Sequence, residues 1–275
     1  MISSTANPTI KRLAQLHERR GRLHQGLYLM EGVRLVEEAL DGDVRPATVL
    51  VAPDLLRATA RGRALHERLR HEPDARAVSG AVHDPIEVSA AVLRHVSGAE
   101  TPAGIVAALP RLPLADLASL PAAAGLVLVL DGIGDPGNAG TILRSAAAAG
   151  IDGVAALSGC ADLYAPKVVR AAMGAHLRVP LAVDVTLAQL ESWLPARGQA
   201  ILADVHAPAS VYDHDLRVPT VLIVGGEAHG ARQTGVLAGV QPVSIPMPGA
   251  AESLNAAVAA AVILFEAVRQ RAGGQ

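Results

Sequence analysis

The sequence predicts a two-domain α/β protein whose larger, second domain contains a parallel sheet covered by helices. The chain has 275 residues, which is long for a single domain, and its hydrophobic content of 51% is ample for a buried core. Apolar strands and helical stripes alternate along the chain, most regularly after residue 125. This alternation is typical of strands joined by helical crossovers.

The first hundred residues predict a small α/β unit. Apolar residues at positions 33, 36, 39 and 40 form a helical stripe after Glu31-Gly32. We expect strands at 48–51, 75–78 and 104–109, and helices at 54–70 and 85–93. Pro110, Pro113 and Pro121 then interrupt an Ala/Leu-rich stretch. The first domain is therefore expected to cover residues 1–109, with a linker at 110–125.

The second domain is expected to cover residues 126–275. Its first strand, 126–130, is continuously apolar, as strands buried in parallel sheets are. Further strands are expected at 153–157, 181–185, 200–203, 218–224 and 243–245. Helices are expected at 138–149, 166–173, 186–194, 231–238 and 256–268. The last helix carries no charge from 256 to 265, so we expect it to be buried nearly all round.

Composition disfavours several classes of protein. One Phe, one Trp and three Tyr argue against an aromatic platform for stacked bases. Cys160 is the single cysteine, which excludes an internal disulfide and a Cys-x-x-Cys metal site and fits a reducing, cytoplasmic setting. No apolar run reaches the roughly 18 residues of a membrane span. We expect no metal and no membrane partner.

Residues 7–24 form a basic arm in a chain whose net charge is −2. The arm carries Lys11, Arg12, Arg19, Arg20 and Arg22 against one acid, Glu18. Such an arm can follow a phosphate backbone. A solvated helix face explains the same charges equally well.

The loop after the strand at 126–130 is rich in glycine and opens a helix. It reads Asp131-Gly-Ile-Gly-Asp-Pro-Gly-Asn138, and the helix continues to Arg144. The letters match a dinucleotide-binding turn, but Pro136 removes one N–H from it and the next strand ends without an acid. We therefore disfavour a nicotinamide oxidoreductase. Asn138 and Arg144 are candidates to hold a phosphate or orient a hydroxyl, whereas a helix cap and a surface ion pair are their simpler interpretations.

Two more turns follow predicted strands. Gly225-Gly226-Glu227 ends one of them, with His229 close behind, and Ile245-Pro-Met247 leads to Ser253-Leu254-Asn255 before the last helix. Ligands of open α/β sheets bind beyond the carboxyl ends of strands, where glycine lets the backbone approach a ligand. A capped core helix is the simpler interpretation of Asn255. Together the three turns predict a cofactor pocket with few charges.

In this order, the three motifs resemble those of the SpoU (TrmH) branch of the SPOUT RNA methyltransferases. They are Asp135-Pro-Gly-Asn-Ala-Gly-Thr-Ile-Leu-Arg144, then Gly225-x-Glu227, then Ile245-Pro-Met247 with Glu252-Ser-Leu-Asn255. The resemblance covers residues 126–270. More weakly, the first half is similar to the small substrate-binding domain of many members. Gly226 departs from the family, which often has Asn there, and His229 receives no role.

The resemblance implies a SPOUT domain with a deep trefoil knot, S-adenosylmethionine as methyl donor, a homodimer, and 2′-O-methylation of a ribose in RNA. Lining of the cofactor pocket is implied for Gly225, Ile245, Met247 and Leu254. The catalytic and RNA-facing set would be Arg144, Asn138, Glu227, Ser253 and Asn255. The basic residues Lys11, Arg12, Arg19, Arg20, Arg22 and Arg34 would contact RNA phosphates.

Ribosomal RNA, 23S in particular, is the expected substrate, because the first domain looks like a reader of structured RNA. Transfer RNA is the alternative substrate. A non-catalytic RNA-binding or ribosome-assembly factor with the same fold is the alternative function. The presence of Asn138, Arg144, Glu227, Ser253 and Asn255 argues against that alternative.

Overall fold

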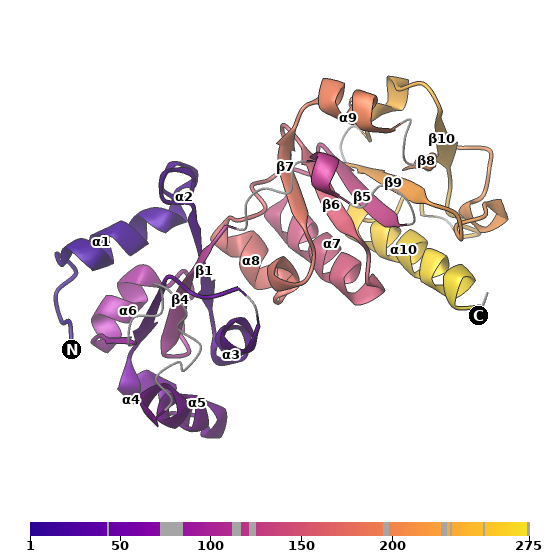
Figure 1. The fold of residues 1–275 in the computed structure, drawn as a ribbon. Helices are drawn as coiled ribbons and strands as arrows, with labels where there is room; N and C mark the ends of the chain where they lie inside the picture. The colour runs from indigo at the N-terminus through magenta and orange to yellow at the C-terminus, as the bar shows by residue number, and fades with distance from the viewer. Residues whose placement is uncertain are drawn as a thin grey trace. The chain divides into compact units, whose positions relative to one another are not determined.

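The computed structural model describes residues 1–42, 44–71, 85–111, 117–120, 125–194, 198–226, 230–231, 233–249 and 251–273 (Figure 1). The chain divides into two compact units. Residues Met1–Leu112 and Tyr164–Leu177 form the first, and Pro113–Leu163 and Arg178–Gln275 form the second. Each unit contains one sheet.

The second unit contains the predicted parallel sheet. Its six strands lie in the order β10-β8-β9-β5-β6-β7, and every neighbouring pair is parallel. They are β5 (Leu126–Asp131), β6 (Gly153–Leu157), β7 (Leu181–Val185), β8 (Gln199–Ala203), β9 (Thr220–Gly225) and β10 (Val240–Val243). Because β5 lies between β6 and β9, the strand order reverses there. Such a switch point is where ligands of open α/β sheets bind.

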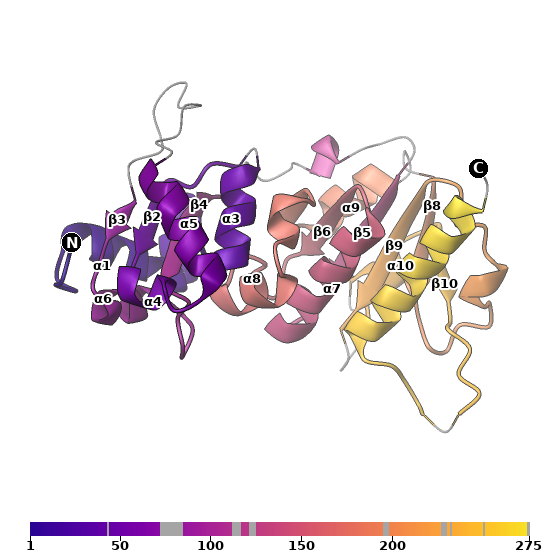
Figure 2. The same ribbon diagram turned by 90° about the horizontal axis from the view of Figure 1, so that it is seen from below.

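Helices cover both faces of this sheet. The long helices α7 (Pro136–Ala149) and α10 (Ala256–Ala272) lie side by side on one face, and α9 (Leu187–Trp193) covers the other (Figures 1 and 2). Side chains alternate along a strand, so Val127 and Val129 of β5 pack in the core cluster that contains Trp193. The alternation places the two apolar faces of β5 against different helices.

The long apolar helix α10 is less enclosed than its sequence predicts. Ile263 and Leu264 are buried, as expected of the side that packs in the unit. Val258 and Phe265, however, are 48% and 49% exposed. The expectation of burial nearly all round is therefore wrong for the single chain.

The first unit holds a four-stranded sheet in the order β1-β4-β2-β3. Strand β4 (Ile105–Pro110) runs antiparallel to β1 (Leu27–Glu31) and β2 (Thr48–Val51), and β3 (Ile86–Glu87) runs parallel to β2. The helices are α1 (Pro8–Ala14), α2 (Arg19–Gln25), α3 (Val33–Asp41), α4 (Pro53–Leu56), α5 (Ala60–His71) and α6 (Ala90–Val96). Leu13 of α1 and Leu93 of α6 pack in one core with Leu50 and Val106 of the sheet.

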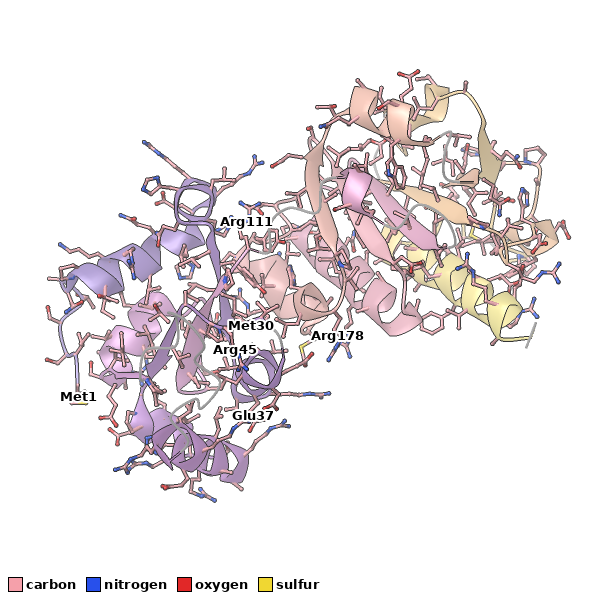
Figure 3. The ribbon with its side chains drawn as sticks, viewed as in Figure 1. Met1, Met30, Glu37, Arg45, Arg111 and Arg178 are labelled. Carbon is pink, nitrogen blue, oxygen red and sulfur yellow. The ribbon has the colours of Figure 1, made fainter. Side chains whose placement is uncertain are left out.

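Charged side chains join the two helices α3 and α5. Glu37 of α3, labelled in Figure 3, pairs with Arg61 of α5. One turn on, Asp41 of α3 lies 2.6 Å from Arg68 of α5. These pairs are partly exposed, so they orient the helices more than they stabilise the unit.

Segment Tyr164–Leu177, which contains α8 (Pro166–Ala172), packs with the first unit although it lies between strands of the second. Arg170 of α8 donates to Glu31 at the end of β1 over 2.9 Å. The ring of Tyr164 lies 5.1 Å from that of Tyr28 in β1. The expected domain boundaries divided the chain at a single linker, so they could not assign this later segment to the first unit.

Most predicted elements are present, and the exceptions are short or irregular. Strand β1 was missed, and the expected helix at 85–93 is the short β3 followed by α6, which Ser89 caps by accepting from the N–H of Val92. The expected helix at 231–238 is only a 3-10 turn, Thr234–Val236. Strand β10 begins earlier than expected and contains Pro242, which an edge strand tolerates. The strand expected at 75–78 lies outside the described residues.

No helix within the described ranges is long and apolar enough to cross a bilayer.

Candidate functional site

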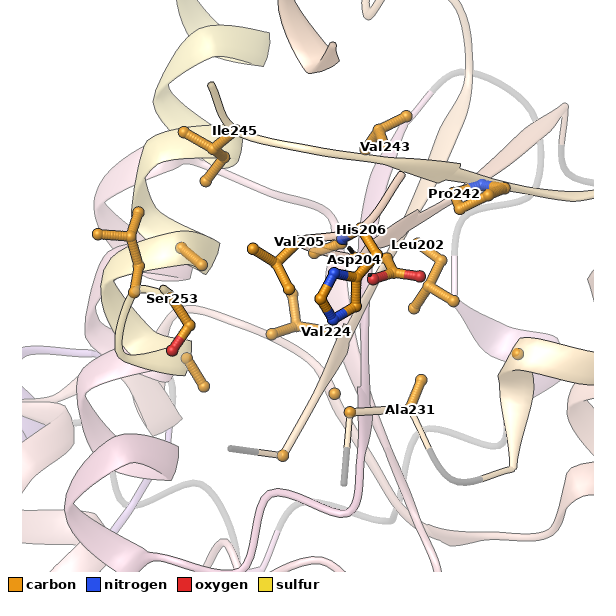
Figure 4. Close-up of a pocket in the computed structure, with 18 of the residues that line it drawn as sticks. Leu202, Asp204, Val205, His206, Val224, Ala231, Pro242, Val243, Ile245 and Ser253 are labelled. Carbon is orange, nitrogen blue, oxygen red and sulfur yellow. Dashed lines mark hydrogen bonds between the residues drawn. The ribbon is translucent and has the colours of Figure 1, made fainter. Parts of the chain in front are cut away.

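A cavity of about 590 Å³ opens at the carboxyl ends of β8, β9 and β10 (Figure 4). The four residues predicted to bind the cofactor, Gly225, Ile245, Met247 and Leu254, all line it. Ser253 lines it too. Two motifs about twenty residues apart in sequence therefore meet around one space, as the sequence predicts.

Glycine is required where β9 ends because two backbone segments approach it closely. A Cβ on Gly225 would lie 2.3 Å from the N atom of Ala231, and a Cβ on Gly226 would lie 2.3 Å from the carbonyl oxygen of Gly132. Real Cβ contacts are not that short, so any side chain would have to displace backbone. In this chain, a side chain at 226 would therefore require the backbone at Gly132 to move. Glu227 and His229 lie outside the described residues.

Asp131, the last residue of β5, anchors the loop that follows β9. Its carboxyl group is fully buried. Oδ2 accepts from the backbone N–H groups of Gln233 and Thr234 over 2.8 and 2.9 Å, and from the Thr234 hydroxyl over 2.9 Å. Asp131 was not among the residues predicted to form the site. The sequence does contain a signal for this role, since Asp131 directly follows five apolar strand residues and should be buried with them. A buried carboxylate needs hydrogen-bond donors from elsewhere in the chain.

The amide side chains of Asn138 and Asn255 meet at the starts of α7 and α10. Asp135 caps α7, since its Oδ1 accepts from the N–H of Asn138 over 2.8 Å, so Asn138 is not the cap. Asn255 caps α10 through Oδ1, which accepts from the N–H of Ala257 over 2.9 Å. Its Nδ2 donates to Oδ1 of Asn138 over 3.0 Å. Asn255 is therefore both a cap and a bridge between the two motifs.

Arg144 extends from the third turn of α7 and is exposed. It makes no hydrogen bond or ion pair with any other described residue, so the simpler interpretation as a surface ion pair finds no support in that part of the chain. A guanidinium in this position can bind an oxygen pair of a phosphate in a fixed orientation.

The basic arm divides into exposed and buried members. Lys11 and Arg12 on α1 and Arg19 and Arg20 on α2 are exposed, as is Arg34 on α3. Arg22 is only 3% exposed, and its Nη1 donates to the carbonyl oxygens of Leu16 and His17 over 2.7 and 2.8 Å. The structure contradicts the prediction that Arg22 contacts RNA, because the guanidinium holds the chain between α1 and α2.

Across the described ranges, no group of three His, Cys, Asp or Glu side chains is arranged to hold a metal ion. Burial raises the pKa of the Cys160 thiol, whose Sγ donates to the carbonyl oxygen of Leu130 over 3.3 Å. This side chain packs and is not activated as a nucleophile.

Comparisons with known proteins agree with this geometry. The sequence model of the SpoU rRNA Methylase family matches residues 125–265, and that of the MRM3-like substrate binding domain matches residues 7–107. A Synechocystis sp. protein named as an uncharacterised tRNA/rRNA methyltransferase is 34% identical over 277 residues, covering 98% of this chain and 94% of that protein. The chain belongs to the SpoU rRNA methylase family.

Two matches from Streptomyces viridochromogenes, one by sequence and one by structure, extend the comparison. The 23S rRNA (uridine(2479)-2′-O)-methyltransferase is 38% identical over 183 residues, which cover 64% of this chain and 63% of that enzyme. The crystal structure of the SpoU methyltransferase AviRb with the cofactor AdoMet superposes with a TM-score of 0.82 at 30% identity, covering 98% of this chain and 100% of that one. This SpoU family member has the fold of the SPOUT methyltransferases, and S-adenosylmethionine is its cofactor.

The residues of the cavity fit that cofactor. Apolar walls such as Val224 and Val243 suit an adenine ring, and the glycine backbone at 225–226 leaves polar atoms within reach of its edges. No Lys or Arg is among the described residues that line the space, so no side chain of that kind repels the sulfonium cation.

Replacing Gly226 by Ala tests the close backbone approach. We expect a weaker affinity for S-adenosylmethionine and a loss of stability of about 1 to 3 kcal/mol, because a methyl group must displace the Gly132 carbonyl. Calorimetric titration and thermal unfolding measure the two effects. Gly134→Ala is the matched control, since a Cβ there meets nothing within 4 Å. Equal behaviour of the two variants would contradict a tight approach at 226.

Proposed function

We propose that this SpoU family protein transfers a methyl group from S-adenosylmethionine to the 2′-hydroxyl of a ribose in RNA, with 23S ribosomal RNA as the substrate. The observation that carries the proposal is the cavity at the ends of β8, β9 and β10, which Gly225, Ile245, Met247 and Leu254 line together. The name of the 23S rRNA relative and the match to a substrate-binding domain support the choice of ribosomal RNA.

The cofactor supplies an electrophilic methyl group. The chain therefore has to bind this donor, align it with the ribose 2′-hydroxyl and allow the hydroxyl to lose its proton. Backbone and apolar walls of the cavity hold the donor. Arg144, Asn138, Ser253 and Asn255 would face the RNA, and aligning hydroxyl and methyl provides much of the acceleration. A guanidinium stays protonated under ordinary conditions, so Arg144 orients the nucleotide through its phosphate. Glu227 stays a predicted member of this set.

Residues 1–109 would be the RNA-binding domain, 110–125 the linker and 126–275 the methyltransferase domain. The match of 7–107 to a substrate-binding domain supports the first assignment. The exposed residues Lys11, Arg12, Arg19, Arg20 and Arg34 would contact phosphates. The trefoil knot stays a prediction from the family resemblance. A ribosomal substrate agrees with the cytoplasmic location expected for a chain with one cysteine.

Transfer RNA is the alternative substrate, and the name of the Synechocystis relative supports it because that name includes both RNAs. A non-catalytic assembly factor is disfavoured, since Asn138 and Asn255 are present and joined by a hydrogen bond at the cavity's end of the two helices.

A homodimer is proposed on the exposed side of α10. Val258, Ala261, Val262 and Phe265 follow helical spacing, and the two outer members are about half exposed. Phe265 is the single phenylalanine of the chain. A second copy of the chain would bury this stripe against its own, and the homodimer implied by the family resemblance favours that occupant over another protein.

Transfer of labelled methyl from S-adenosylmethionine to unmodified ribosomal and transfer RNA tests the function. We expect label in one ribose of 23S rRNA. Arg144→Ala should reduce transfer about a hundredfold or more, because alignment is lost, while cofactor affinity stays unchanged. Arg144→Lys is the matched variant; it keeps the charge but loses the planar fork, so we expect little recovery.

Other outcomes would show whether the proposed substrate or the proposed class of enzyme is wrong. Label in transfer RNA alone would replace the proposed substrate. Cofactor binding without any RNA acceptor would point to a partially assembled particle as substrate, and full activity of Arg144→Ala would remove that residue from the mechanism.

Removing the exposed charges of the basic arm should weaken RNA binding. For the variant with Lys11, Arg12, Arg19 and Arg20 changed to Ala, we expect a lower affinity for an rRNA fragment. The slope of log affinity against log salt should fall by about 0.7 to 0.9 for each phosphate that the variant no longer neutralises. Filter binding over a series of KCl concentrations measures both. Arg217→Ala, an exposed arginine of the second unit, is the control, and an unchanged slope would exclude the arm from the RNA interface.

Light scattering tests the homodimer. We expect twice the chain mass of 28.2 kDa for the unaltered protein and a single chain mass for the double variant Val258→Lys, Phe265→Lys, because two buried charges oppose association. Leu23→Lys alters an equally exposed apolar side chain on α2 and should leave the dimer intact. A single chain mass for the unaltered protein would contradict the proposal.

A further inference from the structure

We propose that Asp204 binds the ribose of S-adenosylmethionine, an inference that rests on the proposed function. Asp204 directly follows β8, beside the end of β9, and its side chain lies next to the cavity with that of His206 (Figure 4). It belongs to none of the three motifs that the sequence analysis identified.

The cavity offers very few polar side chains for a polar ligand. Among the described residues that line it, only Asp204, His206 and Ser253 have polar side chains, and Asp204 has the one carboxylate. S-Adenosylmethionine presents two ribose hydroxyls and an ammonium group, all of which are donors. A carboxylate that accepts from such donors forms stronger hydrogen bonds than a neutral acceptor.

The carboxylate of Asp204 is held in place with one oxygen to spare. The backbone N–H of Asp204 donates to the carbonyl oxygen of Val243 over 2.9 Å, which ties it to β10. Its Oδ1 accepts from the N–H of His206 over 2.9 Å. No hydrogen bond joins Oδ2 to another residue in the described part of the chain. A purely local role, in which the side chain caps a turn, would explain the hydrogen bond to Oδ1 but would leave Oδ2 without a function.

The position of Asp204 in the sheet favours the ribose over the ammonium group. In nucleotide-binding parallel sheets, an acid at the carboxyl end of a strand accepts from a ribose hydroxyl, beside the strand that carries a glycine-rich turn. Here β8 carries the acid and its neighbour β9 carries Gly225-Gly226. The spare Oδ2 can accept from either of the two adjacent ribose hydroxyls.

Calorimetric titration of the full chain with three ligands tests this assignment. They are S-adenosylmethionine, S-adenosylhomocysteine, which lacks the sulfonium charge, and methylthioadenosine, which lacks the amino-acid part as well. Asp204→Ala removes both the carboxylate and the hydrogen bond that forms the turn with His206. Asp204→Asn keeps an oxygen for that hydrogen bond and removes only the charge. We expect both variants to lose about tenfold or more in affinity for all three ligands, since each contains the ribose. Asp213→Asn, at an exposed acid outside the cavity, should change nothing.

Each other outcome overturns the proposal in a different way. Weaker binding of the two amino-acid ligands alone would assign Asp204 to the ammonium group. Weaker binding of S-adenosylmethionine alone would assign it to the sulfonium. Unchanged affinities in Asp204→Asn would show that the carboxylate charge does not bind the ligand and that Asp204 only stabilises the local turn. If the unaltered protein binds none of the three, the proposed function itself fails, whatever the role of Asp204.

Discussion

The buried carboxylate of Asp131 is the constraint on which the architecture of the site depends. A charge without solvent is costly unless donors surround it, and three donors from Gln233 and Thr234 converge on one oxygen. The loop after β9 is thereby fixed to the end of β5. That loop brings Gly230 and Ala231 to the wall of the cavity. A separate backbone hydrogen bond, from the N–H of Gly226 to the carbonyl oxygen of Asp131, holds Gly226 close to the Gly132 carbonyl.

A second polar contact organises the other side of the site. The helices α7 and α10 pack along one face of the sheet, and their first turns are joined through Asn138 and Asn255. Both helices present unpaired N–H groups and a partial positive charge at this end. Side-chain oxygens of Asp135 and Asn255 satisfy part of that demand. The polar residues of the first and third motifs thus stabilise two helix starts and also join them through an amide pair.

The sequence predicts the parallel sheet well because its strands are buried on both faces and are therefore continuously apolar, as in β5 and β9. The meeting of the second and third motifs around one cavity was also predicted, because their residues follow strand ends in a recognisable order. Three features were not accessible. Strand β1 carries Tyr28 and Glu31 whose partners, Tyr164 and Arg170, are more than 130 residues away. Arg22 looks like its exposed neighbours until tertiary structure buries it. Asp131 has a role only once the loop at 233–234 folds back onto it.

The charge distribution of the cavity is consistent with methyl transfer from a sulfonium. Methyl transfer turns the sulfonium into a neutral thioether, so an acidic cluster would stabilise the ground state more than the transition state and would slow the chemical step. Under the proposed function, walls of glycine backbone, valine and alanine would hold the donor by shape. Arg144 and the two helix starts, which carry positive charge outside the lining of the cavity, would face the RNA backbone. In this arrangement, electrostatic attraction would act mainly on the RNA, which must be selected among many RNAs. The cofactor would be bound mainly by packing and a few hydrogen bonds.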